Sequence, residues 1–187
     1  MGLCVFSEKV DFGSPVEKVF KSLTDTDFLL SLFPPSLGFK LQKRSGRYLG
    51  TGCSLSLQAR FFGVPLRWIS YVNSFSANRH YSYIWQKSIL PCWEHDFYFE
   101  TIPAGTRVTE CILYRFPAGS LGTWFDRLFF QSYLRRIYRD RNEKLFRELS
   151  PYNPALAQNR RASSAVHPKP AKSGLRSAPG WGSSPAG

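Results

Sequence analysis

Near the start of the chain the spacing of the hydrophobic positions changes from that of a strand to that of a helix. Residues 2–12 (GLCVFSEKVDF) mostly alternate between apolar and polar, which predicts a strand. In residues 14–23 (SPVEKVFKSL), Ser14 precedes Pro15 and Glu17 follows three residues after the serine, so we expect a helix with a capping box on Ser14. Residues 25–33 (DTDFLLSLF) predict a second short helix, which Pro34 and Pro35 end.

The middle of the chain consists of short runs rich in aromatic and β-branched residues, separated by turn residues. These runs cover residues 39–44, 50–61, 65–75, 79–88, 92–102 and 106–116. Pro103 and Gly105 lie between the last two runs, in an order typical of a hairpin turn. We therefore expect about six antiparallel strands after the two short helices.

The last patterned segment, residues 120–150, predicts one helix of about 28 residues. Its second half has an apolar side formed by Leu134, Ile137, Tyr138, Leu145 and Leu149. The opposite side carries Arg136, Arg139, Asp140, Glu143 and Arg147. Its first half is apolar nearly all round, with Trp124, Phe125, Leu128, Phe129, Phe130 and Tyr133, so we expect that half to be covered on most sides.

This order of elements indicates an α+β fold in which one long helix covers the apolar face of an antiparallel sheet. Residues 1–150 are expected to form this single domain. Residues 151–187 are rich in Pro, Ala, Ser and Gly, and we expect them to be a disordered tail. The tail holds five bases and no acid: Arg160, Arg161, Lys169, Lys172 and Arg176.

Charge and composition narrow the range of functions. The chain has a net charge of +12 and 43% hydrophobic residues, enough for a sizeable core. The basic tail could hold an acidic partner such as nucleic acid or anionic lipid weakly, in a salt-dependent way. Arg135, Arg136 and Arg139 alternate with acids along the long helix, which is more typical of a solvated face. Without a membrane span or signal peptide, a cytoplasmic protein is expected.

The four cysteines are scattered, and we interpret them as core thiols. Cys92 and His95 form a C-x-x-H, but residues three apart on a strand point to opposite faces and cannot share a metal ion. The sequence has no G-x-S-x-G, no H-E-x-x-H and no Gly-rich phosphate loop. We therefore expect neither a metal nor a cofactor, and nothing in this inventory supports catalysis.

Several stretches resemble the START-like, SRPBCC superfamily, which includes the birch-pollen allergen and polyketide cyclases, and its bacterial ligand-binding branch in particular. Residues 14–35 are similar to its opening pair of short helices ending in Pro-Pro. Residues 63–72 (GVPLRWISYV) resemble the turn between its third and fourth strands and the tryptophan that follows. Residues 93–122 resemble its W-x-H-x-x-F, G-T and Y-x-x-P-x-G-x-L-G run. The resemblance covers residues 1–149. Glu110 departs from it, since an aspartate is expected there.

The resemblance implies a helix-grip fold: a curved antiparallel sheet of about seven strands around the long C-terminal helix, with a cavity for an apolar or amphipathic ligand. Aromatic residues at strand spacing are typical of such a cavity, and also of a filled core. Tyr81 belongs to the same stripe. Candidate ligand-binding residues are Trp68, Tyr83, Trp85, Trp93, His95, Phe97, Tyr114, Phe125 and Phe129.

His95 and Asp96 are adjacent, which invites comparison with a catalytic pair. On a strand they point to opposite faces, so they cannot orient each other. His95 then lies on the apolar face and needs a hydrogen-bond partner. A three-residue hairpin loop predicts Leu113 opposite His95, and a two-residue loop predicts Tyr114. A structural histidine is the first interpretation, a ligand contact the second and an acid or base the third.

Three functional hypotheses follow. The leading one is non-catalytic binding or transport of a hydrophobic small molecule such as a lipid, polyketide or isoprenoid, with Trp68, Tyr83, Trp85, Phe97 and Phe129 as walls and a hydrogen bond from His95 or Tyr114. The second is a cyclase or aromatase that uses His95 as acid or base. The third is an interaction module that binds an acidic partner through its basic tail.

Overall fold

A computed structural model describes residues 3–117 and 119–149. The predicted tail and its basic residues lie outside this range. Seven strands form one antiparallel sheet in the order β1-β7-β6-β5-β4-β3-β2. They are β1 (Cys4–Phe12), β2 (Lys40–Arg44), β3 (Ser54–Phe61), β4 (Val64–Ser76), β5 (His80–Gln86), β6 (Cys92–Ile102) and β7 (Gly105–Arg115). The predicted strand count and antiparallel arrangement are confirmed.

Two short helices follow β1, as predicted: α1 (Val16–Thr24) and α2 (Thr26–Ser31). A 3₁₀ turn, η1 (Pro35–Leu37), leads into β2. The predicted capping box on Ser14 is wrong. Helix α1 begins after Pro15 without a side-chain cap, and the Ser14 hydroxyl instead donates to the carbonyl oxygen of Leu149, which ties the start of α1 to the end of the long helix.

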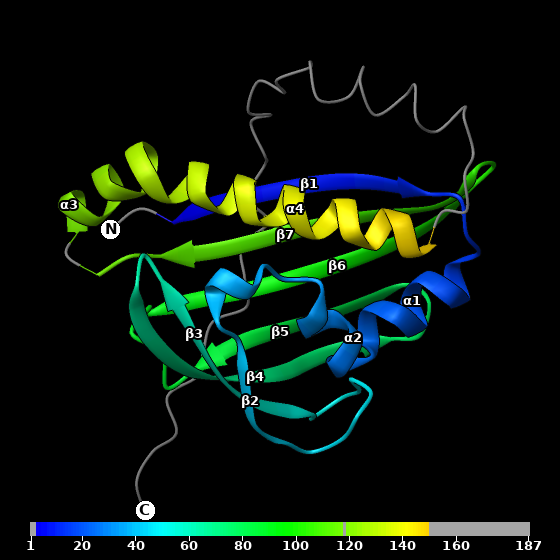
Figure 1. Ribbon diagram of the computed structural model, residues 1–187, viewed down its shortest axis with the longest axis horizontal. Helices are drawn as coiled ribbons and strands as arrows, with labels where there is room; N and C mark the ends of the chain where they lie inside the picture. Colours follow the sequence, from blue (N-terminus) through cyan, green and yellow to red (C-terminus); the bar gives the residue numbers. More distant parts are fainter. Residues whose placement is uncertain (1–2, 118, 150–187) are drawn as a thin grey trace, which may run out of the picture.

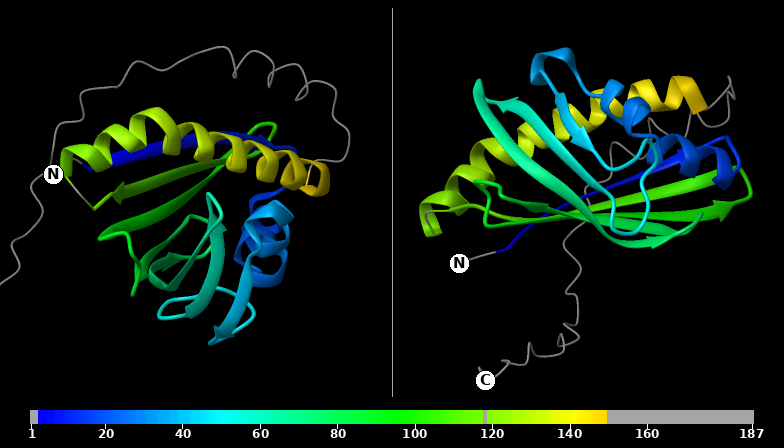
Figure 2. Two further views of the ribbon diagram at one scale, coloured as in Figure 1. Left: turned by 60° about the vertical axis from the view of Figure 1, so that its left-hand side comes forward. Right: turned by 90° about the horizontal axis from the view of Figure 1, so that it is seen from below.

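The sheet curves around the long helix, so the predicted helix-grip fold is confirmed (Figures 1 and 2). Helix α4 (Gln131–Leu149) runs along β1 and β7 and buries the predicted stripe between Leu134 and Leu149. Ring contacts join the two layers, for example Phe6 of β1 and Tyr138 of α4, whose centroids lie 5.3 Å apart. The charged side predicted for this helix faces outward at Arg136, Arg139 and Glu143.

The long helix has three consecutive parts rather than one uniform stretch. Helix α3 (Gly119–Phe125) continues into a π-helical turn, η2 (Asp126–Phe130), and then into α4. The turn η2 places Asp126 and Phe130 in the core. The prediction that this first half is covered on most sides is wrong: Trp124, Leu128 and Phe129 remain at least half exposed because the sheet covers only one side of the helix here.

The β6–β7 hairpin fixes which residues share the inner face of the sheet. Ile102 pairs with Gly105, so the loop is the two residues Pro103 and Ala104. Gly105 has a φ of +135°, and a Cβ added there would clash with the carbonyl oxygen of Phe12, so only glycine fits. With this register His95 lies opposite Ile112. Both predicted partners, Leu113 and Tyr114, are therefore wrong.

Candidate functional site

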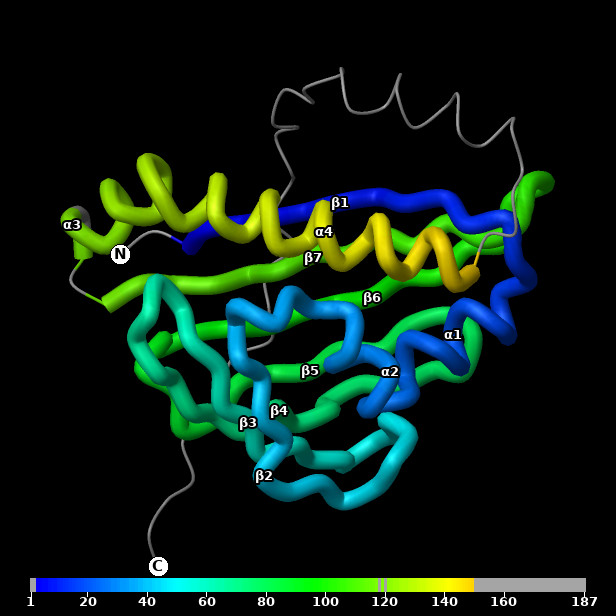
Figure 3. The backbone as a smooth tube through the Cα atoms, in the orientation of Figure 1, coloured from blue at the N-terminus to red at the C-terminus, as the bar shows by residue number. Residues whose placement is uncertain are grey.

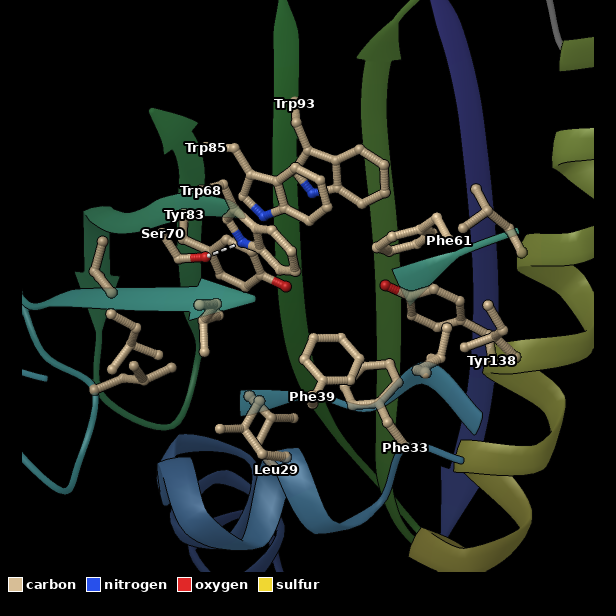
Figure 4. Close-up of a pocket in the computed structure, with 18 residues that line it drawn as sticks. Leu29, Phe33, Phe39, Phe61, Trp68, Ser70, Tyr83, Trp85, Trp93 and Tyr138 are labelled. Atoms are coloured by element: carbon tan, nitrogen blue, oxygen red, sulfur yellow. Dashed lines mark hydrogen bonds between the residues drawn. The ribbon is translucent and has the colours of Figure 1, made fainter. Parts of the chain in front are cut away.

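An apolar cavity lies between the concave face of the sheet, the segment around α2 and helix α4 (Figure 4). The backbone tube in Figure 3 shows the helices and strands that surround it. The centre of a water molecule can occupy a volume of about 60 Å³ inside it, so the cavity is narrow. Its walls are Leu29, Leu30, Phe33, Leu37, Phe39, Leu49, Leu55, Leu57, Phe61, Trp68, Ser70, Val72, Tyr83, Trp85, Trp93, Leu134, Ile137 and Tyr138.

Three stacked indole rings form one wall of the cavity. They come from neighbouring strands: Trp68 from β4, Trp85 from β5 and Trp93 from β6. The ring centroids of Trp68 and Trp85 lie 4.4 Å apart, and those of Trp85 and Trp93 lie 4.0 Å apart. Trp68 donates to the Ser70 hydroxyl over 3.1 Å, whereas the buried Nε1–H of Trp93 has no partner among the described residues. The wall is therefore aromatic and includes one N–H donor without a partner among the described residues.

Polar groups inside the cavity are few and converge. The hydroxyls of Tyr83, on β5, and Tyr138, on α4, point toward one another across the space (Figure 4). Apolar pockets with a small number of convergent polar groups are typical of small-molecule sites, because the polar groups fix the orientation of a ligand held by its apolar body. The phenol hydroxyls of Tyr83 and Tyr138 are such a pair of convergent polar groups.

His95 lies directly behind Tyr83 and is fully buried. Its Nδ1 is 2.7 Å from the Tyr83 hydroxyl, and its Nε2 is 3.1 Å from Oε2 of Glu110. Burial lowers the pKa of His95, and the opposing influence of Glu110 does not reverse this, so the imidazole is neutral at pH 7. Because a carboxylate only accepts, Nε2–H donates to Glu110, and the Tyr83 hydroxyl donates to Nδ1.

Glu110 is held in the core by Arg141 of α4, which donates to its other carboxylate oxygen. Both side chains are almost completely buried, at 4% and 0% exposure. Burial would raise the pKa of Glu110, but the positive charge of Arg141 and the hydrogen bond from His95 outweigh it and keep that pKa below its usual value. A buried charge pair of this kind is tolerated only when further hydrogen bonds satisfy it.

Arg141 also supports the second phenol. Its guanidinium carbon lies 4.7 Å from the centre of the Tyr138 ring and 5.8 Å from that of Phe33, distances typical of cation–π contacts. Arg141 donates to Asn142 as well, while its Nη1 has no hydrogen-bond partner among the described residues. Arg141 therefore contacts the ring of Tyr138 directly and is linked to Tyr83 through Glu110 and His95.

The polar network continues from Arg141 to the edge strand β1. Asn142 accepts from Arg141 and donates to Oε2 of Glu8 over 2.8 Å. Burial and the negative charge of Glu110 raise the pKa of Glu8 to about 7. A continuous set of polar side chains thus links Glu8, near the sheet edge, to Tyr83 in the cavity.

The sequence-predicted ligand-binding residues occupy different places. Trp68, Tyr83, Trp85 and Trp93 line the cavity. His95, Phe97 and Tyr114 are buried in the layer behind it, and Tyr114 donates to Asp126 over 2.5 Å. Phe125 lines a second pocket near the start of the long helix, and Phe129 is half exposed outside both pockets.

These positions change the roles that the sequence suggested. Both ring nitrogens of His95 are occupied by protein partners, so a ligand in the cavity meets Tyr83 rather than the imidazole. The hydroxyl of Tyr114 is engaged by Asp126. The polar contacts offered to a ligand are therefore those of Tyr83 and Tyr138, together with the Nε1–H of Trp93.

The predicted divergence of His95 and Asp96 is confirmed. Asp96 lies on the outer face, where its Oδ1 is 3.0 Å from Nε2 of His80. Cys92 is half-buried at the start of β6, and all four cysteines are free thiols. Among the described residues, no group of three His, Cys, Asp or Glu side chains could hold a metal ion.

Sequence reasoning missed Arg141 and Tyr138 as parts of the site, although a signal was present. Arg141 lies four residues from both Ile137 and Leu145, so it falls on the buried stripe of the helix. Glu110 alternates with Val108 and Ile112 on the inner face of β7. A charge on each of two facing apolar surfaces indicates a buried ion pair, since neither is stable alone.

No protein-family model matches this chain, and no curated protein matches its sequence. Solved structures do match its fold. Zhui aromatase/cyclase from Streptomyces sp. R1128 superposes with a TM-score of 0.62 at 17% identity, covering 88% of this chain and all of that one. Ara h 8.0201 gives a TM-score of 0.56 at 16% identity, covering 77% of this chain and 98% of that one.

A third match is a protein from Thermus thermophilus, with a TM-score of 0.60 at 15% identity over 80% of this chain and all of that one. Identities this low establish architecture and leave activity open. The helix-grip order of the strands, the long C-terminal helix and these superpositions agree with the resemblance noted in the sequence. The chain has the helix-grip fold that these solved structures share, which is the fold implied by the resemblance in the sequence.

Proposed function

We propose that this protein binds a hydrophobic or amphipathic small molecule in the cavity between the sheet and α4. The observation that carries the proposal is the pair of phenol hydroxyls, Tyr83 and Tyr138, facing each other in an otherwise apolar space. The void is also lined by the Nε1–H of Trp93, which has no partner among the described residues. A filled core has no use for such a donor, because a buried donor without a partner costs free energy.

The geometry also describes the ligand. An apolar body would contact the wall formed by Trp68, Trp85 and Trp93. A ligand hydroxyl would lie between the two phenols: it donates to Tyr83, whose own proton is given to His95, and accepts from Tyr138. The unused Nε1–H of Trp93 favours a second acceptor on the ligand. Because the cavity is narrow, a bulky ligand requires the walls to move apart, and a slim planar or linear molecule fits best.

A binding titration tests the proposal. Three of the five tryptophans line the cavity, so intrinsic fluorescence reports occupation directly. The chain is titrated with fatty acids, flavonoids and sterols, and at least one class is expected to quench with saturation. Val72→Phe places a ring into the cavity and should abolish the change, whereas Val5→Phe makes the same substitution at an exposed site and should not. Equal responses from both variants would reject the cavity as the site.

A second candidate function is proton transfer on the bound molecule. The hydrogen-bonded row Tyr83, His95 and Glu110 favours it. When Tyr83 takes a proton from the ligand, its own proton passes to Nδ1 of His95, and Glu110 stabilises the imidazolium that forms. This revises the hypothesis of direct catalysis by His95, since Tyr83 touches the ligand and His95 acts through it.

Exchange of ligand C–H hydrogens in D₂O, followed by NMR, separates the two functions. Catalysed exchange that is lost in His95→Gln, while the ligand still binds, supports proton transfer. Binding without any catalysed exchange supports carriage alone.

A further inference from the structure

Exposed apolar side chains gather at one end of the molecule, near the start of the long helix. Leu121, Trp124, Leu128 and Phe129 of α3 and η2 are between 50% and 67% exposed. Isolated exposed apolar residues are ordinary, but a contiguous group that includes a tryptophan marks an interaction site.

Two further segments extend this group. Phe62, at the tip of the β3–β4 hairpin, lies with its ring centroid 5.8 Å from that of Phe125, which is in turn 5.8 Å from Phe129. Ile89, in the β5–β6 loop, lines the same shallow pocket as Phe62 and Phe125. All three segments meet at the left-hand end of Figure 1. We call the six exposed residues Phe62, Ile89, Leu121, Trp124, Leu128 and Phe129 the apolar end surface.

The tip of the β3–β4 hairpin holds an aromatic residue, Phe62, in a strained backbone conformation. Phe62 and Gly63 form the two-residue loop between Phe61 and Val64, and both have positive φ, at 50° and 81°. Such loops favour Asn-Gly, because a bulky side chain is strained at positive φ. Stacking on Tyr133, at 4.2 Å between centroids, offsets part of this strain and leaves half of Phe62 exposed. Local strain of this kind is typical of functional positions.

The charges around the apolar end surface are nearly all positive. The three segments, residues 60–67, 87–91 and 115–131, contain the bases Arg60, Arg67, Lys87, Arg115 and Arg127. Their one acid, Asp126, is buried and bonded to Tyr114. A second copy of this chain would bring the same positive rim against its own, which opposes self-association. An anionic partner complements the rim.

We propose that the apolar end surface docks onto lipid bilayers that contain anionic lipids. Tryptophan, phenylalanine and leucine enter the boundary between headgroups and acyl chains, while the surrounding lysine and arginine residues contact the anionic headgroups. A surface made of a helix, a hairpin tip and a loop suits a fluid bilayer, which needs no shape-matched partner. Among the described residues, no helix has the length and apolar character to span a membrane, so docking is peripheral.

The location connects docking to the cavity, a step that rests on the proposed function. In the shallow pocket of the apolar end surface, the centre of a water molecule can occupy a volume of about 170 Å³. It shares Phe61 and Trp85 with the walls of the inner cavity. Displacement of these two rings would open a path for a ligand from the bilayer to the site.

Vesicle flotation with the full chain tests the docking proposal without any ligand. Phosphatidylcholine vesicles are compared with vesicles that also contain phosphatidylglycerol, and the chain should float only with the latter. Trp124→Ser combined with Phe129→Ser should lower the affinity for these vesicles at least 10-fold, roughly, because two apolar side chains no longer enter the bilayer. Both side chains are exposed, so their loss leaves the core intact. Arg127→Ser should lower it about fivefold.

The control is Tyr71→Ser combined with Tyr98→Ser, which removes two exposed aromatic residues from the outer face of the sheet and should leave flotation unchanged. If the Trp124/Phe129 variant floats as well as the native chain, other basic segments hold the vesicles and the proposal is wrong. If sedimentation instead shows a native dimer that this variant dissociates, a second copy covers the surface and the proposal is also wrong. Neither result bears on ligand binding in the cavity.

Discussion

Two histidine–carboxylate pairs lie on opposite faces of the same sheet, and their surroundings differ sharply. His95–Glu110 on the inner face is 3.1 Å long, and His80–Asp96 on the outer face is 3.0 Å long. The inner side chains are 1% and 4% exposed, the outer ones 23% and 22%. The distances alone do not distinguish the pairs.

What distinguishes the pairs is the set of groups attached to each. The inner pair continues to Tyr83 in the cavity and to Arg141 on the helix. The outer pair contacts Ser74 and the ring of Tyr98 near solvent. In a low-dielectric interior each unmatched charge or donor is costly, so the inner pair must be complete, whereas water can substitute for either outer partner. The same pair of side chains is thus part of the candidate site on one face and a minor contact on the other.

The largest expected effect comes from removing the charge that balances Glu110. Arg141→Met leaves a buried carboxylate without its cation and should lower the free energy of unfolding by about 3–5 kcal/mol. Arg107→Met is the matched control, since Arg107 pairs with Asp11 at 40% and 36% exposure and should cost less than about 1 kcal/mol. Urea denaturation of both variants measures the difference, and equal losses would contradict the account.

Substituting the two carboxylates compares the pairs directly. Glu110→Gln leaves Arg141 charged and buried, so it should destabilise the fold by about 3 kcal/mol. Asp96→Asn should change stability by about 0.5 kcal/mol, because both partners are partly exposed. Thermal unfolding at pH 7 provides the comparison. A large loss from Asp96→Asn would mean that the outer pair is structural as well.

Tyr83→Phe should affect both stability and ligand binding. Loss of the hydroxyl leaves Nδ1 of His95 unpaired in the core, at a cost of about 1–2 kcal/mol. The ligand loses one hydrogen bond, so its affinity should fall about 5- to 10-fold. Tyr98→Phe makes the same change on the outer face, and calorimetric titration should find its affinity native. Unchanged affinity in Tyr83→Phe would place the ligand oxygen elsewhere.

The smallest expected effect is a pH dependence at the far end of the inner network. Because the pKa of Glu8 in the folded chain is raised to about 7 from its ordinary value of 4.5, the folded state binds the proton more tightly than the unfolded state. Its contribution to stability is therefore present below pH 4.5 and is lost as the pH rises toward 7. Glu8→Gln should remove this decline and be more stable than the native chain at pH 8. The full shift corresponds to about 3 kcal/mol, and partial exposure of the carboxyl to solvent reduces the expected gain to about 1 kcal/mol. Parallel stability curves for the two chains would contradict the raised pKa.

The fold was largely predictable, because alternation along the strands and the stripe from Leu134 to Leu149 are local patterns. The divergence of His95 and Asp96 followed from strand geometry alone. The partners of His95 did not, because they depend on hairpin register and on the packing of a distant helix. Ser14 illustrates the same limit: its local signal indicated a cap, but a contact with Leu149 at the other end of the domain prevails.

The exposed first half of the long helix has a different explanation. Its sequence correctly indicated an unusual apolar surface, but the expectation that this half of the helix is covered on most sides was wrong. The cavity was implied by aromatic spacing, yet a filled core gives the same spacing. The void itself, the facing hydroxyls of Tyr83 and Tyr138 and the unpaired Nε1–H of Trp93 favour a site over a filled core.

Native mass spectrometry of the purified full chain, followed by denaturing extraction, tests ligand binding most directly. The account predicts a bound mass in the native spectrum that is released on denaturation as an apolar compound with an oxygen function. The mass should disappear in Val72→Phe and remain in Val5→Phe. A native chain that carries no ligand and stays unliganded when the titrated fatty acids, flavonoids and sterols are supplied would contradict it.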